Sequence, residues 1–311
     1  MSPDELARLL APRMPRSAWE GWFWIAIPAA PSPVRWAKVH VFASDPTRGA
    51  PIAAVEGLTA ERELCSWIAT ADSVDAERAT PAADAIIADG GVSVRGALDA
   101  RRDEDRWRLT GGALSIAFSP RDRIVWARLP RVLTYVGVHC NLDGKIRDDD
   151  VRGLGVLEHA WGASVPFRPT RLVRGPWHWD VLSLATESEP ADVAALAVTV
   201  PGLGTVGVHA RGRLPGTGQI GFSRFVVRVL EHDSDDALAR TPRRWTGELH
   251  GRAGDLSYEA VASTPVARPA PGVAFLGFDF EGEWRRNGGA PEHVQGRGFA
   301  EHGCPARLPA R

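Results

Sequence analysis

The stretch Val151-Arg-Gly-Leu-Gly-Val-Leu-Glu-His-Ala-Trp-Gly162 decides the fold, because much of it recurs near the C-terminus. The segment Gly153-x-Gly155-x-x-Glu158-His159 has the same residues at the same spacing as Gly296-x-Gly298-x-x-Glu301-His302. Each copy follows an alternating apolar run and a polar turn. Self-similarity at a fixed offset is typical of repeated architecture. The sequence therefore predicts two related β domains in tandem, each closed by a strand that carries an acid and an imidazole.

A Gly-x-Gly segment also occurs in dinucleotide-binding loops, where a strand precedes it and a helix with a third glycine follows. Here the residues after Gly155 lead into a Gly- and Pro-containing stretch that ends at Pro166, and they show no helical amphipathicity. A glycine inside a strand more often marks a bulge, a barrel corner or the close approach of another backbone. The pattern therefore favours strands over a nucleotide site.

The composition is that of an ordinary soluble globular chain, with 311 residues of which 44% are hydrophobic and 24% charged. The formal net charge of −1 indicates no basic surface for nucleic acid or for an anionic membrane. The 3 cysteines are widely spaced and indicate neither a disulfide scaffold nor a zinc knuckle. The sequence has no apolar run long enough to span a bilayer and no signal-peptide pattern. We therefore expect a cytoplasmic protein with no membrane span, no nucleic-acid partner, no metal and no cofactor.

Most of the chain consists of short apolar runs separated by turns about every 8–12 residues, which is typical of antiparallel sandwiches and barrels. A capping box at Ser2–Glu5 predicts a short helix that ends near residue 11. Residues 71–85 are rich in Ala, Asp and Pro and are expected to form a loop or a helical turn. Pro166–Pro169 marks a boundary. We predict an all-β fold with two tandem antiparallel barrel or sandwich lobes, residues 1–165 and 166–311.

Residues 153–162 resemble the Gly-x-Gly-Tyr-x-(Asp/Glu)-His-x-Trp-Gly motif of a lipocalin-like superfamily. That superfamily holds the carotenoid 1,2-hydratases (hydroxyneurosporene synthases), AttH-like proteins and some fungal Diels–Alderases. Trp19–Trp24 and Trp177–Asp180 look like the strands that open the two lobes of those proteins. Val156 and Leu157 stand where an aromatic residue is usual. The resemblance implies two lipocalin-like lobes, and it implies the fold more strongly than one activity, because members differ in reaction.

The first copy of the motif holds the first candidate site residues. Along a strand, Leu157, His159 and Trp161 share one face and Glu158 takes the other, so one of Glu158 and His159 points inward. An inward Glu158 in an apolar cavity would favour its protonated form, which suits a general acid. The alternative is that the pair ties the lobes together, and its repetition as Glu301-His302 favours that architectural role.

The second lobe offers further candidates. His178 and Asp180 share one face of its opening strand, where a carboxylate can orient an imidazole. Asp279, Glu281 and Glu283 share one face of a later strand. Three like charges in a row indicate a solvent face, whereas Asp279 is the candidate acid if that face lines a cavity.

The chain holds 12 Trp beside 2 Tyr, more than a core of this size needs for bulk alone. A Trp-rich core is one explanation, and a Trp-lined ligand site is the other. The expected ligand-binding residues are Trp22, Trp24, Trp161, Trp177 and Trp179.

Together these features predict a cofactor-free enzyme that acts on a hydrophobic terpenoid or polyketide-like molecule by acid-assisted hydration, cyclisation or isomerisation. Glu158 or Asp279 is the expected acid, and His159 or His178 is expected to orient the reacting groups. The alternative is a non-catalytic binding protein or carrier for such a molecule. A buried carboxylate without an arginine partner favours the enzyme, whereas an ion-paired one favours binding or structure. The sequence leaves the oligomeric state open.

Overall fold

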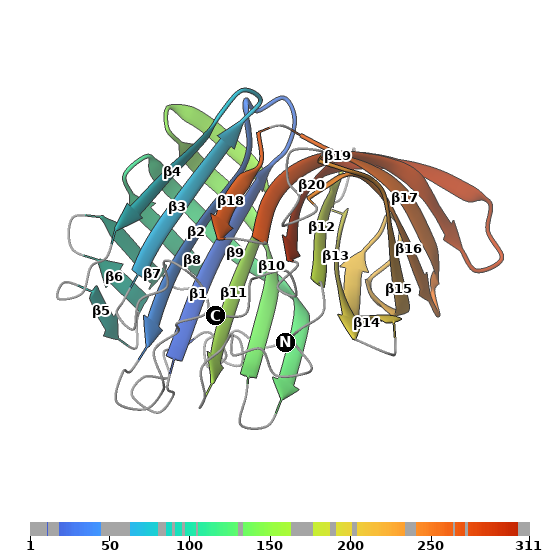
Figure 1. Ribbon diagram of the computed structural model, residues 1–311, viewed down its shortest axis with the longest axis horizontal. Coiled ribbons are helices and arrows are strands. Elements are labelled where there is room, and N and C mark those ends of the chain that lie inside the picture. The colour runs from blue at the N-terminus through green and yellow to red at the C-terminus, as the bar shows by residue number, and fades with distance from the viewer. Residues whose placement is uncertain are drawn as a thin grey trace. The chain divides into compact units, whose positions relative to one another are not determined.

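The computed structural model describes residue 11 and residues 19–44, 63–79, 85–88, 91–94, 97–103, 105–129, 133–162, 177–186, 191–200, 204–233, 241–263, 265–270 and 273–303. Every regular element in these ranges is a β-strand, as the sequence predicts (Figure 1). The helix expected before residue 11 lies outside the described residues. No helix in the described part of the chain is long and apolar enough to cross a membrane. The chain divides into two compact units, Met1–Thr70 with Val74–Arg168, and Ala71–Ser73 with Pro169–Arg311.

The first unit is an antiparallel sheet in the order β4-β3-β2-β1-β11-β10-β9-β8-β7-β6-β5. Its strands are β1 (Trp19–Pro28), β2 (Val34–Ser44), β3 (Glu63–Thr70), β4 (Val74–Ala79), β5 (Ala85–Ala88), β6 (Gly91–Val94), β7 (Leu98–Asp103), β8 (Arg106–Gly111), β9 (Leu114–Leu129), β10 (Leu133–Ile146) and β11 (Asp149–Gly162).

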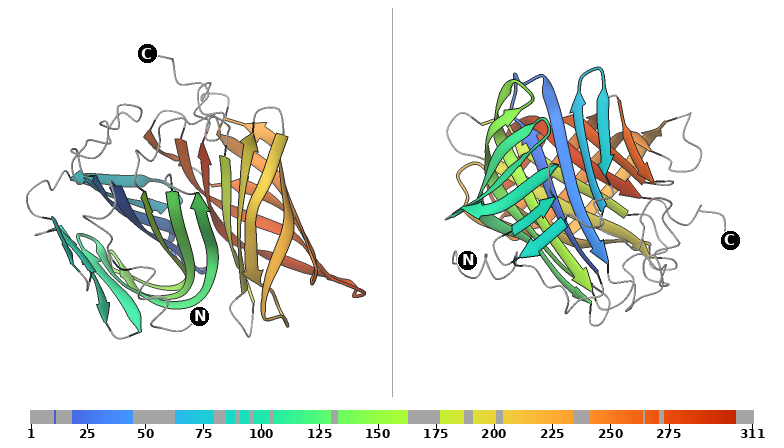
Figure 2. Two further views of the ribbon diagram at one scale, coloured as in Figure 1. Left: turned by 90° about the horizontal axis from the view of Figure 1, so that it is seen from below. Right: turned by 90° about the vertical axis from the view of Figure 1, so that its left-hand side faces the viewer.

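This first sheet curls around its own core, and Figure 2 shows the bend of its long strands β9 and β10. The rings of Trp24 on β1 and Trp107 on β8 lie 6.5 Å apart, although β11, β10 and β9 separate their strands in the sheet. An ion pair between Arg147, in the turn after β10, and Asp75 on β4 also joins distant parts of the sheet. The curl creates an inner face on which side chains of β1–β3 and β6–β11 form a common core.

The second unit is a closed barrel. Its strands are β12 (Trp177–Leu184), β13 (Ala191–Val200), β14 (Gly204–Arg213), β15 (Gln219–His232), β16 (Pro242–Gly251), β17 (Gly254–Ala262), β18 (Ala267–Ala270), β19 (Val273–Arg286) and β20 (Pro291–Gly303). The ring closes because β17 pairs with β19 as well as with β16, while β18 lies outside it on β19. The expectation of two lipocalin-like β lobes is therefore confirmed, one lobe being a barrel and the other a curled sheet.

One sequence expectation about secondary structure was wrong. Residues 74–79 form β4, where the composition predicts a loop or a helical turn. The strand exists because it pairs in register with β3, from Leu64 opposite Ala79 to Ala69 opposite Val74. A neighbouring strand can override a weak local propensity, because it satisfies the backbone hydrogen bonds of the added strand.

The second glycine of each repeated motif leaves room for an aromatic ring that packs directly against its backbone. A Cβ atom on Gly155 would lie 2.5 Å from the ring of Phe118, and one on Gly298 would lie 2.1 Å from the ring of Phe278. Both rings belong to the buried cores of their units. In each lobe, the second glycine of the motif leaves room for a phenylalanine from a nearby strand.

Replacing Gly298 with alanine is expected to lower the free energy of unfolding by about 1–3 kcal/mol, because the added methyl group must displace the buried Phe278 ring. Gly218→Ala is the matched control, since nothing lies within 4 Å of a Cβ atom there. Urea unfolding of both variants tests the expectation. Equal shifts for the two substitutions would contradict the packing explanation.

Candidate active site

The strand that opens the barrel carries a buried carboxylate and a buried imidazole on its inner face. In β12, His178 and Asp180 alternate in step with Leu182, which belongs to the barrel core. Asp180 is 0% exposed and His178 is 6% exposed. The Nε2 atom of His178 lies 2.8 Å from Oδ1 of Asp180. The face that the sequence predicts these residues to share is thus the inner face of the barrel.

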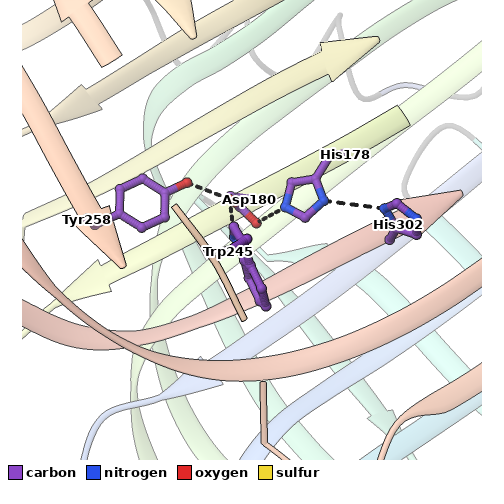
Figure 3. A network of polar contacts seen from close by, with 5 residues as sticks. All are labelled: His178, Asp180, Trp245, Tyr258 and His302. Carbon is purple, nitrogen blue, oxygen red and sulfur yellow. Dashed lines mark hydrogen bonds and ion pairs between the residues drawn. The ribbon is translucent and has the colours of Figure 1, made fainter. Parts of the chain in front are cut away.

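Three polar side chains from different strands converge on Asp180 (Figure 3). Besides His178, the indole Nε1–H of Trp245 on β16 donates to Oδ2 at 3.0 Å. The hydroxyl of Tyr258 on β17 donates to the same oxygen in a short hydrogen bond. Burial, followed by the charge of Asp180, raises the pKa of Tyr258 well above its ordinary value, so this phenol stays protonated. Oδ2 of Asp180 thus takes the bonds from Trp245 and Tyr258, while Oδ1 faces His178.

His302 extends this group toward one end of the barrel. It pairs with His178 across the β12–β20 ladder, next to the final residue of β20. The two Nδ1 atoms lie 3.4 Å apart, a long hydrogen bond, and His302 is 7% exposed. A row of three polar groups therefore runs from the fully buried Asp180 through His178 to His302. His302 is the imidazole of the second copy of the repeated motif.

At alkaline pH, the phenol of Tyr258 is expected to favour unfolding. Its pKa is higher in the folded protein than the value of about 10 for an exposed tyrosine, so the unfolded chain releases the proton first. The stabilisation from this phenol is complete below about pH 10 and is lost as the pH rises from there toward the folded-state pKa. The unfolding free energy should therefore fall more steeply above about pH 10 in wild type than in Tyr258→Phe. Urea unfolding across this range measures the slopes, and equal slopes in the two proteins would contradict the expectation.

The first unit holds another buried carboxylate and imidazole on its inner face. His159 Nε2 lies 2.6 Å from Glu20 Oε1, and both side chains are 0% exposed. Trp22 faces His159 across the β1–β11 ladder, with ring centroids 5.1 Å apart in a stacked arrangement. The ring of Trp161 lies 4.6 Å from that of His159, and Trp24 continues the same core. The structure thus gathers His159, Trp22, Trp24 and Trp161 around an acid that was not among the expected site residues.

Glu158 does not share the inner face with His159. Successive strand residues point to opposite sides, so Glu158 lies on the other side of β11. Among the described residues of the first unit, Glu20 is the carboxylate that contacts His159. Glu158 is 8% exposed, so it is also buried, but it does not share a face of the strand with His159.

Asp279 lies on the outer face of β19, where its side chain is 54% exposed, while Phe278 and Phe280 on either side belong to the core. This placement agrees with the solvent-face interpretation of the three acidic residues.

The alternation within β12 also decides where two of the expected ligand-binding tryptophans point. Trp177 and Trp179 point away from the barrel interior, because His178 and Asp180 occupy its inner face.

The sequence offered an unused signal for Glu20, because alternation alone puts it on one face with Trp22 and Trp24. It offered none for Trp245 and Tyr258, which lie 65 and 78 residues from Asp180 and reach it only through closure of the barrel. Within the described residues, no group of three or more His, Cys, Asp and Glu side chains is arranged to hold a metal ion.

Two solved structures are similar to this chain. An AttH-type protein from Nitrosomonas europaea aligns with 96% of this chain and 98% of its own, at a TM-score of 0.61 and 14% sequence identity. Kievitone hydratase from Nectria haematococca aligns with 91% of this chain and 88% of its own, at a TM-score of 0.51 and 12% identity. No protein-family model and no curated protein matches the sequence. At such identities the likeness shows the fold, and it confirms the resemblance read from the repeated motif: the chain has the two-lobed lipocalin-like fold of AttH-like and hydratase proteins.

Proposed function

We propose that this protein is an enzyme that hydrates, cyclises or isomerises a hydrophobic small molecule by proton transfer, without a cofactor. The reacting group is the row Asp180–His178–His302 in the barrel. One observation carries the proposal: the buried Asp180 carboxylate pairs with His, Trp and Tyr, and among the described residues none of its partners is an arginine or a lysine. A carboxylate held in this way orients an imidazole and stabilises its protonated form.

The surroundings of the row fit an apolar substrate of terpenoid or polyketide type. His178 contacts the ring of Trp245, which in turn packs edge-on against Phe278. Electrostatic interactions are stronger in such an apolar, water-poor interior than at a surface. Kievitone hydratase, which shares the fold, is named for the addition of water, so hydration is among the proposed reactions.

We assign the first unit a structural role in this proposal. Glu20 and His159 are both fully buried and pair with each other, and Trp22 and Trp161 pack on the imidazole. This arrangement corresponds to the Trp-rich core that the sequence left as an alternative. The proposal therefore moves the acid–base chemistry from Glu158 and His159 to the barrel.

The test is a turnover assay on a panel of terpenoid, polyketide-like and phenolic lipids, with wild type and Asp180→Asn. Mass spectrometry would detect products that have gained one water, and chromatography would detect products of unchanged mass. Turnover of one compound by wild type and its loss in the variant would support the enzyme. Tight binding by both proteins without any product would identify a carrier instead.

A further inference from the structure

The strands β14 and β15 are paired over only part of their length. Their ladder ends where Ala210 lies opposite Phe222. Beyond that pair both strands continue, as residues 204–209 of β14 and 223–232 of β15, yet the described ladder holds no pair between these two continuations. Each strand keeps its other neighbour there, β13 or β16. The two strands therefore separate over this stretch, which we name the β14–β15 gap, and backbone groups that leave a ladder need water or a new partner.

The inner face of β15 is partly exposed at this gap. Val229 is the ladder partner of Trp245 on β16, so the two side chains share the inner face of the barrel. Val227 lies two residues earlier on the same face, and both valines pack on the barrel core. Both valines are half-buried, whereas Trp245 is fully buried, and Leu230 in the bulge after Val229 is 42% exposed. Solvent therefore reaches inward-facing apolar side chains at the gap.

The β14–β15 gap lies at the end of the barrel that holds the polar row. Antiparallel neighbours alternate in direction, so the start of β12, the end of β13, the start of β14 and the end of β15 share one end of the barrel. His178 and Asp180 lie in the first half of β12. Val229 is also linked to the row by contact, because its ladder partner Trp245 donates to Asp180 at 3.0 Å.

The strand β13 lies between the polar row and the gap, and it presents small residues on its inner face. Ala195 is the ladder partner of Asp180, and Ala197 is that of His178. On its other side Ala197 pairs with Gly207 of β14, which has no side chain. An apolar molecule at the gap therefore meets no bulky side chain at these positions of β13 on its way to the row.

We infer that the hydrophobic substrate enters the barrel sideways through the β14–β15 gap, and that Val227 and Val229 line its path to the polar row. This inference rests on the proposed function and adds the route by which the substrate reaches the site. Valine side chains recognise a molecule by its apolar surface, so the gap admits a neutral hydrophobic compound and excludes a charged one. The exposure of inward-facing valines favours a small molecule over a partner strand, which would need the backbone edge of β15 alone.

The route can be tested with the neutral fluorescent probe 1-aminoanthracene and the intact protein by stopped-flow mixing. A bulky side chain at an entrance slows entry and exit alike, because both use the same path. We expect Val229→Trp to lower the association and dissociation rate constants about tenfold each, with Kd changed by less than about threefold. Val261→Trp is the matched control and should keep the wild-type rates, because Val261 is 53% exposed on the outer face of β17.

A second variant covers the case in which the new side chain at Val229 disturbs Trp245. Val227→Trp, whose ladder partner is Gly247, should slow both rate constants as well, with an unchanged near-ultraviolet circular dichroism spectrum. Unchanged rates in both variants, an equal slowing in Val261→Trp, or no binding of the probe to wild type would overturn the inference. A dimer that dissociates on Leu230→Lys, with probe rates unchanged in the valine variants, would show that the edge of β15 pairs with a second copy instead.

The two ideas fail in distinguishable ways. Turnover of a panel lipid that depends on Asp180, combined with wild-type probe rates in Val229→Trp and Val227→Trp, would leave the enzyme proposal intact and overturn the route. Slowed probe rates in both variants without turnover of any lipid would support the route and overturn the enzyme proposal.

Discussion

Replacing Asp180 with asparagine is expected to lower kcat by about 10²–10⁴-fold while the barrel remains folded. The amide has one acceptor oxygen and one donor NH₂ group, whereas the carboxylate presents acceptors to three donors. If the amide oxygen keeps Trp245 and Tyr258, the NH₂ group faces His178 Nε2. His178 then loses the carboxylate that orients its imidazole and stabilises the protonated form of the ring. We expect kcat and kcat/KM to fall together, as they do when a group acts in the transition state.

The chain offers a matched control for this substitution. Asp255 lies 3.2 Å from His250 on the same barrel, and their side chains are 56% and 41% exposed. Asp255→Asn makes the same chemical change in an exposed Asp–His pair and should leave kcat unchanged. A variant at Asp180 that keeps more than half of the wild-type kcat, with Asp255→Asn behaving alike, would show that the buried row does not take part in the reaction.

Replacing Glu20 with leucine is expected to destabilise the first unit by about 3–5 kcal/mol, which is typical when one partner of a buried pair is removed. His159 is 0% exposed and would lose the acceptor 2.6 Å from its Nε2 atom. An unsatisfied buried polar group costs more than the net gain of the hydrogen bond that satisfied it. Urea unfolding should show a shift confined to the transition of the first unit, because the substitution leaves the barrel core unchanged.

The double substitution Glu20→Leu with His159→Leu tests whether the lost stability comes from the unpaired polar group or from altered packing. Replacing both partners with apolar side chains of similar size is often close to neutral, so the double variant should recover most of the lost stability. Asp143→Leu, in the exposed pair with Arg152, is the control and should change stability little. A double variant less stable than Glu20→Leu would show that the pair contributes net stabilisation to the core of the first unit.

The sequence predicts which residues of the candidate site share one face of a strand, because successive side chains point to opposite sides. Alternation alone puts His178 with Asp180, and His159 with Trp161, and the structure keeps both groupings. It does not decide which face points inward, because both faces of these strands carry large apolar residues. This ambiguity is why Glu158 was expected as an interior acid and Trp179 as a ligand contact. In the structure, Leu157 and Leu182 belong to the cores and identify the inner faces.

By itself, the sequence determined the β class of the protein, its two lobes and the strand segment that is repeated in both of them. These features are local, because hydrophobic periodicity, turn residues and internal similarity can be read within short windows. Only the tertiary structure decided which carboxylate meets which imidazole. Trp245 and Tyr258 reach Asp180 because the barrel closes between β17 and β19, and Glu20 meets His159 because β1 pairs with β11. Contacts between residues so distant in the chain depend on register and closure, and no local pattern encodes them.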